Sequence, residues 1–227
     1  MRWAALVVGP LCVALSLVGG SASAAGVLVD RAVVRFSAPE TGGVRSPRFI
    51  FARELAFEAR LEALADPDRP PGDTPYLERH LRAALERHVA ETLLASLRVV
   101  PRPTAEELGE QTRVARAMLL DRVGGRAALE QAAAAEQVDE RIILQVLRRT
   151  ARASLYLDRM VAPMLDPSES ELRLVHRSSD LASLPYEDAR PRLWRLVVGR
   201  RLVRALSAFY QNARPRLSIA ILDASGA

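Results

Sequence analysis

The sequence predicts a mostly α-helical protein with a small β ribbon formed by one strand near each end of the chain. Apolar residues recur every three or four positions through most of the chain, which is the period of a helix with one buried face. Residue pairs that cap helix N-termini also occur, at Thr104 with Glu107 and at Ser168 with Glu171. Two segments near the chain ends are instead short and rich in β-branched residues, as strands are.

The first strand is expected over residues 26–36 (GVLVDRAVVRF), where apolar and polar residues partly alternate. A loop rich in proline and glycine follows it. Ser46 and Pro47 then form the pattern of an N-cap with proline at the first helical position. We therefore expect the first helix to start there and to include the apolar residues from Phe49 to Leu64. Residues 66–75 (DPDRPPGDTP) cannot continue a helix and predict a loop.

A second helix is expected from Thr74 and Pro75 by the same N-cap pattern. Its apolar face is formed by residues four positions apart: Leu77, Leu81, Leu85, Val89, Leu93 and Leu97. The third helix starts at the capping box of Thr104 and ends near two glycines at positions 124–125. A short alanine-rich helix over residues 126–136 follows.

The longest predicted helix covers about residues 139–165 and is apolar on more than one side, which indicates a central position among several neighbours. A short capped helix then runs from Ser168 to about His176. The last helix is expected from Pro185 to about Asn212, disturbed at Pro191. Its apolar residues have the spacing of a helix-packing seam: Leu196, Gly199, Val203, Leu206 and Tyr210.

A second strand is expected at residues 217–222 (LSIAIL). Neither strand can leave its backbone groups unpaired, and pairing with each other satisfies both. We therefore expect the two strands to pair with each other and to join the ends of the chain into a single unit.

Residues 1–24 have the pattern of a secretory signal peptide. Arg2 precedes an apolar run up to Val18, and residues 22–24 (ASA) form a small-x-small cleavage site. The run is shorter than the span of about 20 residues that a transmembrane anchor requires. We expect cleavage after Ala24 and export to the periplasm, with residues 25–227 as the mature domain.

Composition restricts the functional classes. The chain has a net charge of +5, which becomes +4 without the first 24 residues, and all 32 Lys-plus-Arg positions are arginine. Its only cysteine, Cys12, lies in the predicted signal peptide, so disulfides, thiol catalysis and cysteine–zinc sites are not expected. Acidic residues are interleaved with the arginines and export is predicted, so nucleic acid is not an expected partner.

No catalytic motif is evident, and no cofactor or metal is expected. The chain contains no GxSxG, GxGxxG, P-loop or HExxH pattern. His88 and Glu91 lie one turn apart on the second predicted helix, but two ligands do not make a metal site. We expect His80, His88 and His176 to be surface residues.

Several of these segments together resemble the SurA-type periplasmic chaperones. The similar parts are the opening strand, the helix RFIFARELAFEARL, the segment LRAALERHVAETLLASL followed by PTAEEL, the segment from ILQVLRRT to ELRLVHR, and the final helix and strand. The resemblance implies an N-terminal helical part over residues 25–177, completed by a C-terminal helix and strand over residues 185–222. It also implies binding of unfolded or outer-membrane polypeptides.

The chain departs from this family in one main respect. SurA-type proteins carry a parvulin domain, a peptidyl-prolyl isomerase of about a hundred residues, where this chain has only residues 177–184. We therefore expect a chaperone-like protein without enzymatic activity. Two alternatives remain, an enzyme of the peptidyl-prolyl isomerase family and a dedicated assembly partner of one envelope complex.

Two sets of residues are candidates for contact with partners. Adaptable apolar side chains suit a binder of many unfolded sequences, although core packing explains any one of them. These client-binding candidates are Phe49, Phe51, Phe57, Met118, Met160 and Met164. The last helix also has a basic face formed by Arg190, Arg192, Arg195, Arg200, Arg201 and Arg204. This face is either merely solvated or contacts an anionic client segment or an anionic membrane surface.

Overall fold

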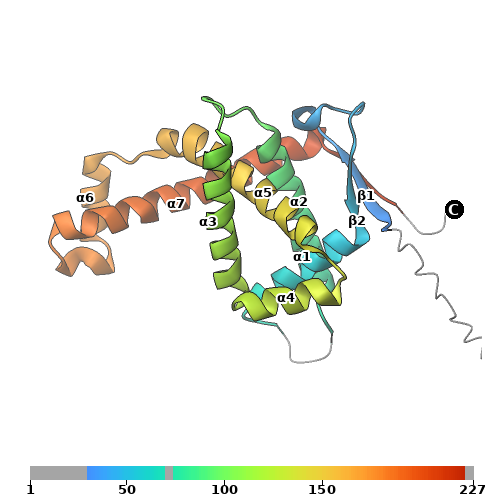
Figure 1. The fold of residues 1–227 in the computed structure, drawn as a ribbon. Helices are drawn as coiled ribbons and strands as arrows, with labels where there is room; N and C mark the ends of the chain where they lie inside the picture. Colours follow the sequence, from blue (N-terminus) through green and yellow to red (C-terminus); the bar gives the residue numbers. More distant parts are fainter. Residues whose placement is uncertain (1–29, 70–73, 223–227) are drawn as a thin grey trace, which may run out of the picture.

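The structure is a computed structural model that describes residues 30–69 and 74–222. The predicted signal peptide at residues 1–24 lies outside the described residues. Within the described ranges the protein is mostly helical, with seven α-helices and a three-stranded antiparallel sheet, which confirms the predicted fold class (Figure 1). No helix in these ranges is long and apolar enough to cross a membrane.

The sheet joins the two ends of the chain. Its strands are β1 (Ala32–Ser37), β2 (Arg48–Phe51) and β3 (Ser218–Ile221), in the order β2-β1-β3. The first strand pairs antiparallel with the last, Phe36 opposite Ile219, so the predicted pairing of the chain ends is confirmed. A 3₁₀ turn, η1 (Pro39–Thr41), begins the connection from β1 to β2.

The strand β2 was not predicted, because its residues were assigned to the start of the first helix. Ile50 is fully buried whereas Phe49 and Phe51 are exposed, which is the alternation of a strand. Arg35 lies opposite Phe49 in the β1–β2 ladder. Pairing with β1 gives these backbone groups partners that a frayed helix end would lack, and the helix therefore begins at Ala52.

The helical body consists of five helices: α1 (Ala52–Ala65), α2 (Glu78–Ser96), α3 (Ala105–Val123), α4 (Arg126–Ala135) and α5 (Glu140–Tyr156). The helix α5 packs on both α2 and α3, and α1 packs on α2, so the predicted central position of α5 is confirmed. Its N-cap is Asp139, whose side chain accepts a hydrogen bond from the Ile142 backbone. One core lies among α1, α3, α4 and α5 around Phe57, Leu61 and Leu147.

The long helix predicted to reach residue 165 ends earlier. After Tyr156 the chain continues as one π turn, η2 (Leu157–Val161), and one 3₁₀ turn, η3 (Ala162–Leu165). Pro163 has no amide hydrogen to donate, and its ring clashes with the carbonyl four residues earlier in a regular helix. A change of helical pitch at this point avoids that clash.

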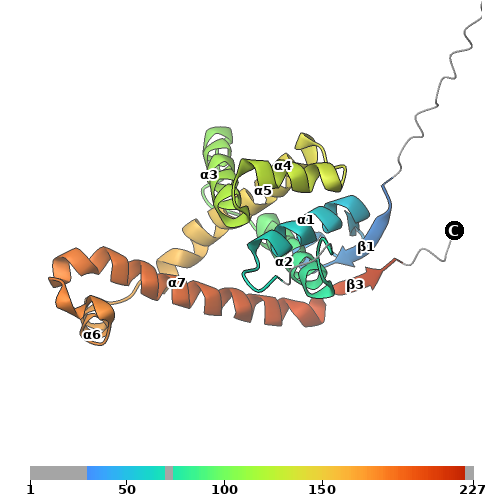
Figure 2. The ribbon, with the colours of Figure 1, turned by 90° about the horizontal axis from the view of Figure 1, so that it is seen from below.

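The C-terminal elements lead away from the helical body and then return to it. They are α6 (Glu169–Arg177), a 3₁₀ turn η4 (Asp180–Ser183), α7 (Tyr186–Ala213) and a 3₁₀ turn η5 (Arg214–Arg216). Figure 2 shows α7 as a long rod with α6 at one end and β3 at the other. We call α6, η4 and the first half of α7 the arm. The arm has a small core of its own around Leu172, Ala189 and Leu193.

The predicted packing seam on the last helix is mostly wrong. Leu196 and Val203 are 40% and 68% exposed, while the neighbouring Leu193 and Val197 are buried. The helix α7 contacts α6 near its start. Near its end, Tyr210 packs against the core beneath the sheet, which includes Val89 of α2. Its middle section connects two separate cores, and this is why the seam residues there have no helix to pack against.

Removal of β3 is expected to destabilise the whole protein. A chain that ends at Leu217 leaves one edge of β1 unpaired, and the loss of a few backbone hydrogen bonds at about 1 kcal/mol each predicts a loss of about 2–4 kcal/mol. Thermal unfolding should then shift down by roughly 5–10 °C, measured against a chain that ends at Leu222. An unchanged melting temperature would show that the chain-end pairing is not structurally important.

Candidate functional site

A surface hollow of about 480 Å³ lies between the strand β2 and the helices α2 and α5. Phe49 and Phe51 line it from β2, and they are 46% and 40% exposed. They face outward because Ile50 between them enters the core, and neighbouring strand residues point to opposite faces. The strand thus places two aromatic rings at the surface as a consequence of its own burial pattern.

A second hollow of about 660 Å³ adjoins the first. It lies where α2 ends and α3 begins, and the two hollows share Ala95, Ser96 and Arg152. Its apolar lining comes from the α2–α3 connection, α3 and α5, and consists of Leu97, Val99, Val100, Leu108 and Leu155. We call the two adjoining hollows the groove.

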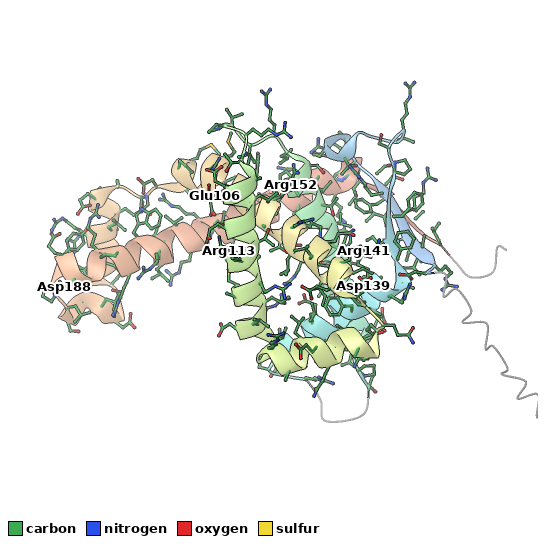
Figure 3. All side chains as sticks on the ribbon, viewed as in Figure 1. Glu106, Arg113, Asp139, Arg141, Arg152 and Asp188 are labelled. Atoms are coloured by element: carbon green, nitrogen blue, oxygen red, sulfur yellow. The ribbon has the colours of Figure 1, made fainter. Side chains whose placement is uncertain are left out.

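Exposed arginines surround the groove. Arg48 lies beside the phenylalanines on β2, and Arg98 and Arg102 lie in the α2–α3 connection. Arg152, labelled in Figure 3, lies on α5 and lines both hollows. None of these four guanidinium groups forms an ion pair with another residue in the ranges 30–69 and 74–222. The groove therefore combines apolar walls with uncompensated positive charge.

Beneath the groove lies a buried cluster of charged residues. Glu54 and Glu58 are one turn apart on α1, His88 and Glu91 are one turn apart on α2, and Arg149 comes from α5. The side chains of Arg149, Glu54 and Glu58 retain only 9%, 6% and 5% of their exposure.

The guanidinium group of Arg149 connects all of these residues. Its Nη1 lies 3.0 Å from Glu54 Oε1, its Nη2 lies 2.6 Å from Glu58 Oε1, and its Nε lies 3.3 Å from Glu91 Oε2. His88 Nδ1 lies 2.9 Å from Glu58 Oε1. Three helices are thus joined through one cation.

The pKa values in the cluster follow from burial and charge. Burial alone would raise the pKa of the Glu58 carboxyl, but Arg149 and His88 outweigh burial, and the pKa lies below its usual 4.5. Burial raises the pKa of Glu91, and Arg149 offsets this only in part. Burial alone would lower the pKa of Arg149, but the surrounding carboxylates outweigh it and raise that pKa. Arg149 therefore stays charged.

The cluster has the composition of a metal site, but its ligand oxygens are already in use. Ligand atoms of Glu54, Glu58 and His88 lie within 4.8 Å of one another. Arg149 already occupies Glu54 Oε1 and Glu58 Oε1, the oxygens that face His88, so a metal ion would have to displace the guanidinium from them. The expectation that His88 is a surface residue is wrong, since His88 is 5% exposed, and His80 is also buried.

The six apolar client-binding candidates lie in different parts of the structure and differ in exposure. Phe49 and Phe51 line the groove together. Phe57 is fully buried in the core of the body, so its candidacy as a contact for a bound chain is wrong. Met118 is 68% exposed on α3, and Met160 and Met164 lie in η2 and η3, where Met164 is 74% exposed and Met160 is half-buried. The three methionines do not line the groove.

The basic face of α7 is partly neutralised. Arg201 contacts Glu171 at 2.6 Å and Arg190 contacts Glu169 at 3.2 Å, both from α6. These pairs connect α7 with α6. The remaining members of the face are exposed and form no ion pair with described residues: Arg192, Arg195, Arg200 and Arg204.

Comparison of the chain with protein-family models, with curated proteins and with solved structures finds no match.

Replacement of Arg149 by methionine is expected to destabilise the protein by about 3–5 kcal/mol at pH 7, because three buried carboxylates then lose their cation. Chemical denaturation measures this change. Arg148→Met, an exposed neighbour on the same helix, is the control and should change stability by less than about 0.5 kcal/mol.

The loss of folding stability in Arg149→Met, relative to the unaltered protein, should become smaller as the pH falls from 7 to 5. Without the cation, burial raises the pKa values of the carboxyls, so protonation stabilises the folded variant in this range. In the unaltered protein the pKa of Glu58 is lowered, so its stabilising contribution is lost only below about pH 4.5. A deficit that is independent of pH would contradict this electrostatic account.

Proposed function

We propose that this protein is a periplasmic chaperone-like protein that holds unfolded or outer-membrane polypeptide segments in the groove, without a cofactor. The observation that carries the proposal is the pair of exposed phenylalanines, Phe49 and Phe51, on an edge strand that borders an arginine-rimmed hollow. Exposure of aromatic side chains to water is energetically unfavourable, and such side chains on a concave surface are typical of binding sites.

The edge of β2 offers a second kind of contact. Since the strand order is β2-β1-β3, no strand of the described chain pairs with the other edge of β2. An extended polypeptide can add to such an edge through backbone hydrogen bonds, which every sequence can form. The phenylalanines and the groove would then contact alternate side chains of the added segment. This combination tolerates many client sequences.

The expected affinity is modest. Transfer of a half-exposed phenylalanine from water to an apolar contact contributes about 1–2 kcal/mol at ~25 cal/mol per Å². Ordering of an unfolded client opposes this gain. A holding protein requires such reversible binding, because the client must leave without nucleotide-driven release.

The connection between α6 and α7 supports a body without an inserted isomerase domain. The chain turns from α6 to α7 within residues 178–185, and His176 Nε2 lies 3.0 Å and 3.1 Å from the carbonyl oxygens of Leu181 and Leu184. The connection at the point where that family carries its parvulin domain is therefore a tight, internally bonded turn. Together with the paired chain ends, this favours a client-binding body without an isomerase.

The main test is suppression of aggregation of an unfolded outer-membrane protein. The variant Phe49→Ala/Phe51→Ala should require at least three times more protein for half-maximal suppression, because the groove loses its aromatic wall. The matched control Leu174→Ala/Val203→Ala removes two large exposed side chains, 60% and 68% exposed, from α6 and α7. An equal loss in both variants, or in neither, would refute the groove as the binding site.

Two further assays distinguish the proposed chaperone from an isomerase-family enzyme and from a dedicated assembly partner. Acceleration of proline isomerisation in a short peptide would favour an enzyme of the isomerase family over the proposal. Recovery of one stoichiometric protein from a cell extract, rather than many unfolded ones, would favour a dedicated assembly partner.

The arginines of the groove predict a charge preference among clients. Arg98→Glu/Arg102→Glu should weaken binding of an extended peptide with apolar and acidic residues by about tenfold, and should change binding of its Asp→Asn, Glu→Gln counterpart by much less. Raised salt should weaken only the first interaction. Fluorescence anisotropy of labelled peptides measures both, with Arg113→Glu on the exposed face of α3 as the control. Equal affinity for the two peptides would contradict the prediction.

A further inference from the structure

A separate cavity of about 380 Å³ lies among α1, α2, α3 and α5, on the other side of the buried charge cluster. It shares no lining residue with the groove. Its volume is at the lower end of the range of small-molecule sites, about 300–1,000 Å³.

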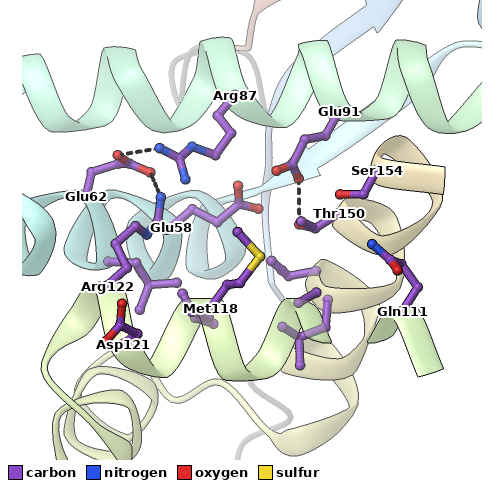
Figure 4. Close-up of a pocket in the computed structure, with 15 residues that line it drawn as sticks. Glu58, Glu62, Arg87, Glu91, Gln111, Met118, Asp121, Arg122, Thr150 and Ser154 are labelled. Carbon is purple, nitrogen blue, oxygen red and sulfur yellow. Dashed lines mark hydrogen bonds and ion pairs between the residues drawn. The ribbon is translucent and has the colours of Figure 1, made fainter. Parts of the chain in front are cut away.

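Most of the cavity wall is apolar. The apolar lining comes from α1, α3 and α5 and consists of Leu61, Ala115, Met118, Leu119, Val146 and Leu147. The thioether of Met118 projects from α3 toward the carboxylates of α1 and α2 (Figure 4). Because Met118 is 68% exposed, it lies at the mouth and can move aside, as unbranched methionine side chains do.

Two carboxylates reach this cavity with an oxygen that lacks a partner. Glu58 binds Arg149 and His88 through Oε1, and Glu91 binds Arg149 and Thr150 through Oε2. Glu58 Oε2 and Glu91 Oε1 receive no hydrogen bond from any residue in the described parts of the chain. Glu58 is 95% buried and lines the cavity, so its second oxygen is available to a hydrogen-bond donor that enters there.

The remaining charges leave the cavity negative. Glu62 is satisfied by Arg87 at 3.0 Å and by Arg122 at 3.5 Å. Four acidic residues line the cavity against these two arginines, since Asp121 is also present. Even when Arg149 behind the wall is included, one negative charge remains in excess.

We propose that this cavity binds an organic cation, an amine or guanidinium group on an apolar stem, with the cationic group between Glu58 and Glu91. An ammonium group carries three donors and can bridge the two free oxygens, while its stem lies against Leu119 and Val146. A metal ion does not match this lining, because its wall is mostly apolar. The site is distinct from the groove and does not depend on the function proposed for it.

The cation can come from a free amine or from a lysine or arginine side chain of a polypeptide. Both sources share the same chemistry, so the probes include phenethylamine and a blocked lysine-containing tripeptide. Tighter binding of the tripeptide assigns the site to polypeptide side chains, and tighter binding of phenethylamine assigns it to free amines. Either result supports the cation site.

The experiment follows the methyl resonance of Met118 in the purified protein labelled with ¹³C-methyl methionine. Met160 and Met164 serve as internal controls because they lie in η2 and η3, outside the cavity lining. Phenethylamine should shift the Met118 signal saturably. Its neutral analogue 2-phenylethanol should bind at least tenfold more weakly. Equal binding of the alcohol, or no saturable shift at Met118 with either cationic probe, would overturn the proposal.

A variant tests the role of the Glu91 carboxylate in binding the cation. Glu91→Gln retains the shape of the side chain and should weaken phenethylamine binding about tenfold while leaving 2-phenylethanol unchanged. The matched control is Glu130→Gln, an exposed residue of α4 paired with Arg126. An unchanged affinity in Glu91→Gln would refute the site. The comparison of amine with alcohol uses the unaltered protein, so it remains decisive even if this variant does not fold.

Discussion

The buried guanidinium of Arg149 is the interaction on which the helical body depends. It holds carboxylates from α1 and α2 against α5, and these contacts join residues that are 58, 91 and 95 positions apart in the sequence. The cluster lies between the groove and the cavity. The same ion pairs therefore form the floor of the groove and part of the wall of the cavity. A buried ion pair does not by itself add stability, but it fixes how three helices are placed.

The second constraint is the position of the C-terminal strand. Since β3 occupies one edge of β1, β2 can pair only with the other edge and itself becomes an edge strand. The helix α7 carries the chain from the arm back to the sheet, and Tyr210 and Ala213 dock it on the core that also holds Phe36. The end of the chain therefore decides which strand edge remains open beside the groove.

Local signals in the sequence predicted most of the fold. The capping box at Thr104 and the N-cap at Ser168 mark real helix starts, although the Glu171 side chain contacts Arg201 and does not complete the second predicted box. The glycine at position 124 adopts a left-handed conformation at a real helix end. The strand β2 was missed because its four residues are too few for periodicity to distinguish from a helix start. The charge cluster was missed because it is formed between helices. The available signal was that Glu54 and Glu58 share a helix face with the buried Leu61, where an unpaired charge would be costly.

The register of β2 connects this missed strand to the proposed function. Phe36 lies opposite Arg48 and Val34 opposite Ile50, so Ile50 enters the core and both phenylalanines face the groove. A shift by one residue would bury Phe49 and Phe51 and expose Ile50, because side chains alternate between the two faces of a strand. The apolar core site that accepts Ile50, next to Val34, Phe36 and Val89, would then have to hold larger rings, at a cost in packing. The same packing that stabilises the sheet thus keeps the aromatic surface open.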